Sequence, residues 1–452
     1  MSAPASPRGR PRGGLAGGAR PTAAGIGAVA LGYVPLGLLL VGGLLAWWGE
    51  AYWNYSDGVY LLTARTLDGG LYAEVAAAQP PLLFWLGSAI LSVSDSVLAV
   101  RAALALVALG TGWLVALCVW RLTAGRTASA LAGVAALVTP WRLHESLTLT
   151  PESLAAPLLL GAALLAADQR RRRGQLAGLA AATAACFKLA FVVPALALAC
   201  GAAARRHYAT SASLSAAAFA ALALALYGGA IVENVLTAQA QTGAREPGAV
   251  AALLVQAAWN LAPLLLPAGL AWWLRAWLAD LALVRCLGTL LIGELLLVPT
   301  VLKQGTSLNL LAVVEPTAVV LAAGGVVALL RAARSPGSAA LPRAAAAVVA
   351  ACAVTVGLQS ASLLLSPDDP GLFARPFSAL AYQRTLSGEE VDAAVARAQA
   401  CPPEVAYSGP PYLAFMAGRS MPADQPDQFI LARARVHAIK LSAAQADQPR
   451  CP

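Results

Sequence analysis

Charged residues are scarce in this 452-residue chain, where Asp, Glu, Lys and Arg together make up 12%. A soluble globular domain carries about 25%, so the composition excludes a soluble enzyme, and the 59% content of hydrophobic residues excludes a disordered chain. Most of this sequence can only be dissolved in lipid. The formal net charge of +9 is therefore interpreted as anchors at the ends of membrane spans, and we predict no nucleic-acid partner.

Lysine, histidine and cysteine are also rare. The lysines are Lys188, Lys303 and Lys440, so arginine supplies nearly all of the basic charge. The three histidines and seven cysteines form no CxxC or Cys/His metal-ligand spacing. Cys401 and Cys451 are the two cysteines outside apolar runs, and they can pair if the C-terminal segment faces an oxidising compartment.

Eleven apolar runs are predicted to span the membrane, since a span takes roughly 20 residues. We assign the apolar stretch 81–93 to the membrane surface or to a re-entrant turn. With this choice the arginine clusters share one side with the N-terminal tail, which the positive-inside rule makes cytoplasmic. The predicted spans lie at about 25–48, 97–120, 127–141, 154–167, 174–187, 189–204, 211–231, 256–274, 278–301, 308–331 and 344–364.

This topology divides the chain into three parts. Residues 1–24 are predicted to be a disordered basic cytoplasmic tail, and residues 25–365 a transmembrane domain with a large first external loop, 49–95. Residues 366–452 are predicted to be a small extracytoplasmic domain, in which 387–400 has a helical pattern with Ser387 as its N-cap and 403–409 favours a short strand. The predicted fold class is an all-α polytopic membrane protein with a small α/β C-terminal domain.

The residues able to do chemistry gather on the external face in this topology. Asp57 lies in the first external loop and shares a helical spacing with Tyr60, Ala64 and Leu67, which predicts a helix on the membrane surface. A carboxylate there can accept a proton from an acceptor hydroxyl; the alternative is an ordinary solvated acid. The external set is Glu50, Asp57, Asp68, Glu74, Glu145, Glu152, Glu233, Lys188 and Lys303.

The first loop resembles the signature of the GT-C glycosyltransferases, polytopic enzymes that take a sugar from a polyprenyl-phosphate carrier. The branch with protein O-mannosyltransferases and aminoarabinose transferases is closest in pattern. The resemblance implies that Asp57 is the catalytic base. Many members carry Asp-Glu here, whereas this chain has Asp57-Gly58. The matching positions are Asp57, Tyr60, Ala64-Arg65, Gly69-Gly70-Leu71-Tyr72, Pro80-Pro81-Leu82 and Phe84-Trp85-Leu86.

Two lysines extend the resemblance. Lys188 ends a Gly- and Ala-rich span that is followed by a Pro-containing span, and Lys303 begins a tight external turn that runs to Asn309. An ammonium group at an external helix end can pair with a lipid phosphate, so Lys188, Lys303 and Arg65 are the predicted donor-phosphate ligands. The alternatives are a snorkelling lysine at 188 and a capped polar turn at 303.

Further substrate contacts are predicted at Tyr60, Glu145, Glu152 and Asn309. Glu152 follows Pro151, so a helix start with an acid favoured by the helix dipole is the competing interpretation. Glu294 and Asp280 lie in or near the span 278–301, and Glu294 is a secondary candidate. The sequence assigns no cofactor with certainty, and a divalent metal is an open alternative that Asp57 with Glu145 or Glu152 could hold.

The predicted protein is an inverting glycosyltransferase of the bacterial inner (plasma) membrane. Asp57 would deprotonate an extracytoplasmic hydroxyl of a glycan, lipid or protein acceptor, and the lysines would stabilise the leaving polyprenyl phosphate of the sugar donor. The alternatives are a lipid or solute transporter or flippase, and a non-catalytic membrane scaffold. A transporter predicts inverted repeats and charges at the midplane, whereas the polar residues here gather at one face.

Overall fold

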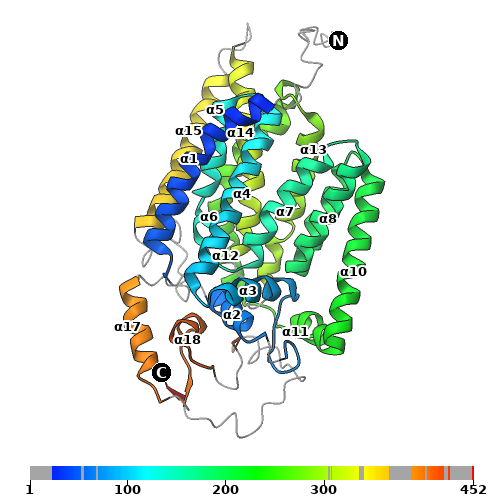
Figure 1. Ribbon diagram of the computed structural model, residues 1–452. Helices are drawn as coiled ribbons and strands as arrows, with labels where there is room; N and C mark the ends of the chain where they lie inside the picture. The colour runs from blue at the N-terminus through cyan, green and yellow to red at the C-terminus, as the bar shows by residue number, and fades with distance from the viewer. Residues whose placement is uncertain are drawn as a thin grey trace.

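A bundle of long apolar helices forms the body of the computed structural model, which describes residues 23–51, 55–67, 70–303, 306, 308–334, 341–365, 388–402, 405–421, 426–427 and 450–451. Figure 1 shows the N-terminal end of α1 at one end of the bundle and α2, α3, α17 and α18 at the other. The predicted tail lies outside the described residues except for Ala23 and Ala24, which begin α1.

Each of the eleven predicted spans corresponds to a helix of the bundle, as expected for a multi-pass membrane protein. Seven helical segments of the described chain are long and apolar enough to cross a membrane, judged by length and composition. The most enclosed is α14, which packs against α4, α5, α7, α12 and α13. The eleven are α1 (Ala23–Trp48), α4 (Val97–Thr123), α5 (Arg126–Leu137), α7 (Pro151–Ala166), α8 (Arg171–Phe187), α9 (Val192–Gly201), α10 (Arg205–Val232), α12 (Pro247–Trp273), α13 (Leu281–Leu295), α14 (Leu311–Ala333) and α15 (Leu341–Leu365).

Local sequence signals set the ends of these helices. The Ser96 side chain caps α4 by accepting a hydrogen bond from the Leu98 N–H, and Ala124 ends α4 in the left-handed conformation with φ 54°. Pro151 opens α7 at a position where a missing N–H costs nothing. The Asp280 side chain caps α13 by accepting from the Leu283 N–H.

Short helices near one end of the bundle position the candidate site. Because α5 has 12 residues, it covers about 18 Å of a hydrocarbon layer about 30 Å thick. The chain therefore turns inside the bundle, where α6 lies, and the loop from α6 to α7 is buried. The short elements of this part are α2 (Tyr55–Arg65), α3 (Leu82–Val93), α6 (Pro140–Glu145), η2 (Leu189–Phe191), η3 (Glu233–Thr237), α11 (Ala238–Gln241), η5 (Val298–Leu302) and η6 (Leu308–Leu310). The short η4 (Arg275–Trp277) lies at the opposite end, between α12 and α13.

The stretch 81–93 is helical. It forms α3, which lies beside α2 at one end of the bundle (Figure 1). Its 12 residues reach about 18 Å, the same length as α5. The eleven crossings and the position of 81–93 at the membrane surface remain predictions.

The C-terminal segment is a small α/β unit joined by a disulfide. α17 (Gly388–Gln399) forms where the helical pattern predicts it, while Ser387 lies outside the described residues. β1 (Ala406–Tyr407) pairs in parallel with β2 (Arg450–Cys451). Cys401 and Cys451 are bonded, which confirms the predicted pair. α18 (Pro411–Ala417) packs against both α17 and α2.

Gly58 explains how α18 can lie so close to α2. A Cβ at this position would lie 2.2 Å from the Tyr412 backbone nitrogen and 2.7 Å from its Cα. No side chain fits between two backbones at that distance. The chain thus departs from an Asp-Glu pair at the place where its own C-terminal helix contacts α2.

Candidate active site

Asp57 lies in the first turn of α2 and is fully buried. Its Oδ2 accepts a hydrogen bond from Arg101 Nη2 at 2.5 Å, and its Oδ1 accepts one from the Leu149 N–H at 2.7 Å. Burial raises the pKa of Asp57, while the Arg101 guanidinium and the Leu149 N–H oppose that rise. α4 and the α6–α7 loop together fix the orientation of this carboxylate.

Arg101 is a site residue that sequence reasoning missed. It sits near the start of α4, is fully buried, and also donates to the Leu147 carbonyl. Its guanidinium lies 5.8 Å from the ring centroid of Tyr412 in α18. The available signal was an arginine inside the apolar run 97–120, because an ionisable residue within a span needs a partner.

Lys188 and Lys303 come together although 115 positions separate them in the chain. Lys188 Nζ lies 2.6 Å from Glu152 Oε1, in the first turn of α7. Lys303 donates to Gln239 Oε1, and burial together with the nearby Lys188 ammonium lowers the pKa of Lys303. Two neighbouring ammonium groups and one carboxylate make a locally cationic site, which suits a phosphate group.

Lys188 reaches this place because α8 stops there. Lys188 has an extended backbone, with φ −156° and ψ 124°, between the end of α8 and η2. The Pro-containing α9 follows η2. The break leaves the Lys188 side chain at the end of two helices, 22% exposed, where a ligand can reach it.

Tyr60 and Glu145 link Asp57 to the lysine pair. Tyr60 lies one turn beyond Asp57 on α2, and its hydroxyl accepts a hydrogen bond from Gln79 Nε2 at 3.2 Å. Burial raises the pKa of Tyr60, as do the nearby Glu152 and Asp427 and, less strongly, Glu145. Glu145 also contributes to the raised pKa of Asp57, so these side chains share one buried polar cluster.

Glu145 has partners within its own segment. Its Oε1 lies 2.7 Å from His144 Nδ1, and its Oε2 accepts from Thr148 Oγ1 at 3.0 Å. Asn309 is 9% exposed within η6, just before α14. The substrate roles predicted for both residues remain predictions.

Arg65 lies at the other end of α2 and contacts different residues. Its Nε donates to Asp95 Oδ1 at 2.9 Å and its Nη1 donates to the Phe415 carbonyl at 2.6 Å. The guanidinium lies 3.5 Å from the centroid of the Phe415 ring. In this structure Arg65 ties α18 to α2, and its predicted contact with the donor phosphate stays a prediction.

The secondary candidate Glu294 lies in the last turn of α13, and Asp280 caps the other end of that helix. Glu294 is buried and accepts from Thr317 Oγ1 at 3.1 Å. Asp280 pairs with Arg121 at the opposite end of the bundle from α2 and caps α13. Asp280 is therefore explained by a structural role.

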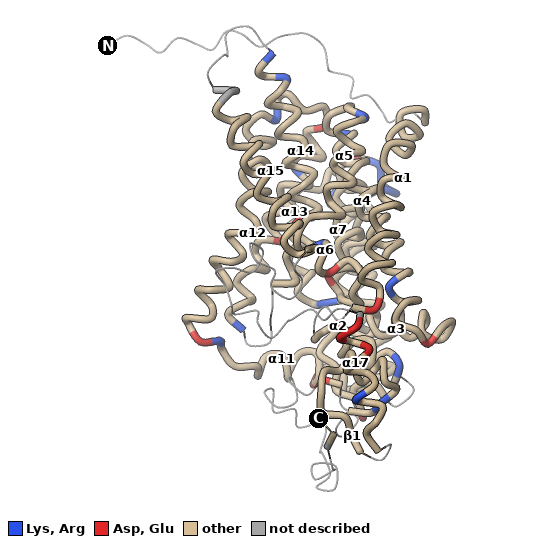
Figure 2. The backbone as a smooth tube through the Cα atoms, turned by 90° about the vertical axis from the view of Figure 1, so that its left-hand side faces the viewer, with Lys and Arg blue, Asp and Glu red and all other residues tan. Residues whose placement is uncertain are grey.

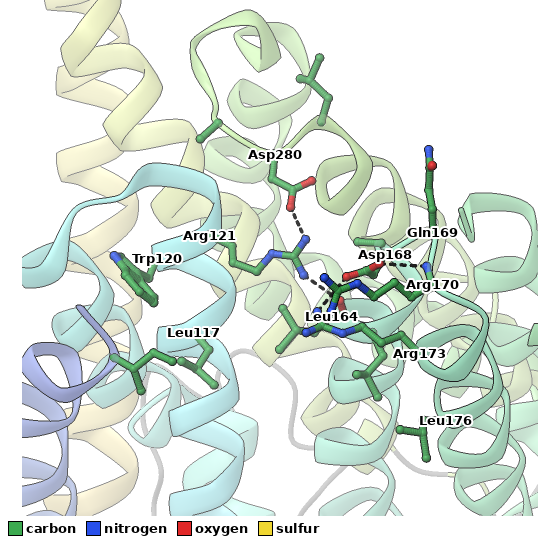
Figure 3. Close-up of a pocket in the computed structure, with 15 residues that line it drawn as sticks. Leu117, Trp120, Arg121, Leu164, Asp168, Gln169, Arg170, Arg173, Leu176 and Asp280 are labelled. Carbon is green, nitrogen blue, oxygen red and sulfur yellow. Dashed lines mark hydrogen bonds and ion pairs between the residues drawn. The ribbon is translucent and has the colours of Figure 1, made fainter. Parts of the chain in front are cut away.

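A cavity of about 1030 Å³ surrounds that Asp280–Arg121 pair. Figure 3 shows the Arg121 side chain directed toward Asp280, with Arg173 near Asp168. Arg173 and Asp168 form an ion pair at 2.9 Å. The cavity lies at the far ends of α7 and α8 from the lysine pair and shares no lining residue with the polar cluster.

Within the part of the chain that the structure describes, no group of three or more His, Cys, Asp or Glu side chains is arranged to hold a metal ion.

Fold and site together define a polytopic helical membrane protein with a recessed polar site at one end of its bundle. No family model and no curated protein sequence matches the chain. The chain is similar to the crystal structure of ArnT from Cupriavidus metallidurans bound to undecaprenyl phosphate, with a TM-score of 0.60 and 15% identity over 94% of this chain and 90% of that one. The apo structure of the same ArnT gives a TM-score of 0.58 and 16% identity over 88% and 86%. The chain therefore has the ArnT fold, and the GT-C-like fold class is confirmed.

Proposed function

We propose that this protein is a membrane glycosyltransferase that moves a sugar from a polyprenyl-phosphate carrier to an acceptor hydroxyl, with inversion. The observation that carries the proposal is the convergence of Asp57 with the Lys188–Lys303 pair, from segments far apart in sequence, in one recessed cluster. The ArnT structure with the same fold is bound to undecaprenyl phosphate, which supports a polyprenyl-phosphate lipid as the partner.

In the proposed reaction the acceptor oxygen attacks the anomeric carbon of the donor sugar. The bond from that carbon to the phosphate oxygen breaks, and Asp57 takes the proton from the acceptor hydroxyl. A carboxylate can accept about four hydrogen bonds, so the bonds from Arg101 and Leu149 orient Asp57 and still allow one from the acceptor. Lys188 and Lys303 stabilise the negative charge on the leaving polyprenyl phosphate.

The charge distribution supports an orientation with the N-terminus in the cytoplasm of a bacterial cell. Figure 2 shows acidic residues gathered around α2 and α17 at one end of the molecule. The opposite end carries Arg121, Arg170–Arg173, Arg275 and Arg331, and arginine-rich ends face the cytoplasm. The site and the C-terminal unit would then face the extracytoplasmic side of the plasma membrane.

Binding of undecaprenyl phosphate to the purified protein in nanodiscs tests the phosphate site. A charge-assisted hydrogen bond contributes about 1.5–3 kcal/mol, so Lys188→Ala should weaken binding about tenfold or more. Arg275→Ala is the matched control, because Arg275 lies at the opposite end and contacts Trp272. Equal affinity of wild type and Lys188→Ala would remove the assigned role of Lys188.

The same preparation separates the enzyme from a flippase. A flippase would bind the carrier lipid and leave the sugar–phosphate bond intact. Release of free undecaprenyl phosphate from a sugar-loaded lipid, in the presence of acceptor, supports the transferase. Lipid binding without any cleavage across a panel of sugars and acceptors would favour the flippase.

A further inference from the structure

Arg142 is a fully buried arginine that the proposed reaction does not use. It lies in α6, is 1% exposed, and its three guanidinium nitrogens have no hydrogen-bond partner among the described residues. Glu315 lies nearby on α14, but its carboxylate accepts from the backbone N–H groups of Trp141 and Arg142, at 3.2 and 2.9 Å. Glu315 thus balances the charge of Arg142. The guanidinium N–H groups of Arg142 still have no acceptor among the described residues.

Two amide side chains on α12 share this situation. Gln256 is fully buried, and in the described structure neither its nitrogen nor its oxygen has a hydrogen-bond partner. Asn260 lies one helical turn further on the same face of α12. Its Oδ1 accepts from Trp141 Nε1 at 3.2 Å, while its Nδ2 has no partner among the residues described. The Asn260–Trp141 bond joins this face of α12 to α6.

The polar face of α6 is continuous with the catalytic cluster. Glu145 lies three residues after Arg142, on the same face of α6, and the two charges interact. Glu145 also interacts with Asp57. Figure 1 shows α6 within the bundle, on the side of α2 that leads into the bundle. The unused donors of Arg142 therefore lie one helical turn further along α6 from Asp57 than Glu145 does.

Unpartnered buried amides and guanidinium groups destabilise a fold unless something binds them. Here the occupant must both donate and accept hydrogen bonds, because Gln256 offers an oxygen as well as a nitrogen. It need carry no net charge, because Glu315 balances Arg142. A neutral polyhydroxyl group, such as a sugar ring, has these properties.

We propose that Arg142, Gln256 and Asn260 form the pocket for the hydroxyl groups of the donor sugar. This inference rests on the proposed function, and it assigns these three residues to recognition of the sugar part of the donor lipid. The donor sugar is the terminal group of its lipid and can be enclosed in the bundle. An acceptor must leave the rest of its chain outside the bundle, so we assign it to the side of Asp57 that faces away from α6.

The test compares two probes, undecaprenyl phosphate and undecaprenyl phosphate carrying mannose, glucose or arabinose, by native mass spectrometry of protein in nanodiscs. Wild type should bind at least one sugar-loaded lipid more tightly than the bare lipid. Gln256→Met should remove that preference, with about tenfold weaker binding of the sugar-loaded lipid and unchanged binding of the bare lipid. Arg142→Met should do the same. Gln169→Met, at the opposite end, is the control.

A second readout separates a ligand pocket from a purely structural role. Gln256→Met removes an unpartnered amide at nearly constant volume, so the ligand-free protein should melt at a higher temperature than wild type. Gain of stability together with loss of sugar preference supports the pocket.

Three outcomes would overturn the assignment. Retention of the sugar preference in Gln256→Met shows that these groups do not contact the sugar. Equal weakening of both lipids indicates a general distortion. An unchanged donor affinity with a raised KM for the acceptor would assign the pocket to the acceptor. If wild type binds neither lipid, the proposed function itself fails.

Discussion

Gly58→Ala should disturb the site without touching a reacting group. The added Cβ would lie 2.2 Å from the Tyr412 backbone nitrogen, whereas ordinary contact begins near 3.4 Å. Because the obstacle is backbone, it cannot rotate away, and α18 must recede from α2 by roughly 1 Å. Overpacking of this kind costs about 1–3 kcal/mol.

The loss of activity should be larger than the loss of stability suggests. α18 holds Tyr412 beside Arg101, which in turn orients Asp57. A misplacement of about 1 Å can reduce a rate by about 100-fold. We therefore expect a lower melting temperature and a transfer rate reduced about 10- to 100-fold, while binding of undecaprenyl phosphate at the lysine pair stays close to wild type.

Gly43→Ala in α1 is the matched control, since a Cβ there meets nothing within 4 Å. Melting temperature and sugar transfer are measured for both variants in the same nanodiscs. If Gly58→Ala resembles Gly43→Ala in both measurements, α18 does not lie against α2 in the working protein, and the described closure of the site is wrong.

Three further predictions concern the tail, pH and topology. Reduction of the Cys401–Cys451 bond, which spans 50 residues, should destabilise the C-terminal unit by about 4 kcal/mol in the chain-entropy model, and unchanged melting after complete reduction would contradict this. Because burial raises the pKa of Asp57 and a base acts when ionised, kcat/KM should fall as pH drops, starting above the ordinary aspartate range near 3.9; a flat profile down to pH 4 would argue against Asp57. Cysteines placed at Glu74 and Gln169 should label from the outside and the inside respectively, and labelling from the same side would refute eleven crossings.

The arrangement of the helices was largely predictable because it follows from composition. Apolar runs were enough to predict the eleven helices of the bundle, while the number of crossings and the surface position of 81–93 remain predictions. The helix around Asp57 followed from its spacing with Tyr60 and Ala64, and the pairing of Cys401 with Cys451 followed from elimination of the cysteines in apolar runs.

The residue pairs within the site were harder to predict from the sequence, because they depend on contacts between segments far apart in the chain. Arg101 was part of an apolar run, and its pairing with Asp57 depends on how α4 approaches α2. The side-chain atoms of Arg142 and Gln256 that have no hydrogen-bond partner among the described residues can be recognised only once burial is known. From the sequence, Gly58 stands where many GT-C members carry a Glu. The reason for a glycine is its contact with the backbone of Tyr412, 354 positions later in the chain.

The most direct test of Asp57 as the base is sugar transfer by Asp57→Asn from the undecaprenyl-phosphate sugar that wild type uses. Asparagine keeps the shape and an oxygen for the Leu149 N–H but cannot take a proton. Its melting temperature is recorded alongside, because it also leaves the Arg101 charge less well paired. Loss of a general base predicts a rate about 10²–10⁴-fold lower, with donor binding retained at Lys188 and Lys303. Transfer at the wild-type rate would contradict the assignment of Asp57.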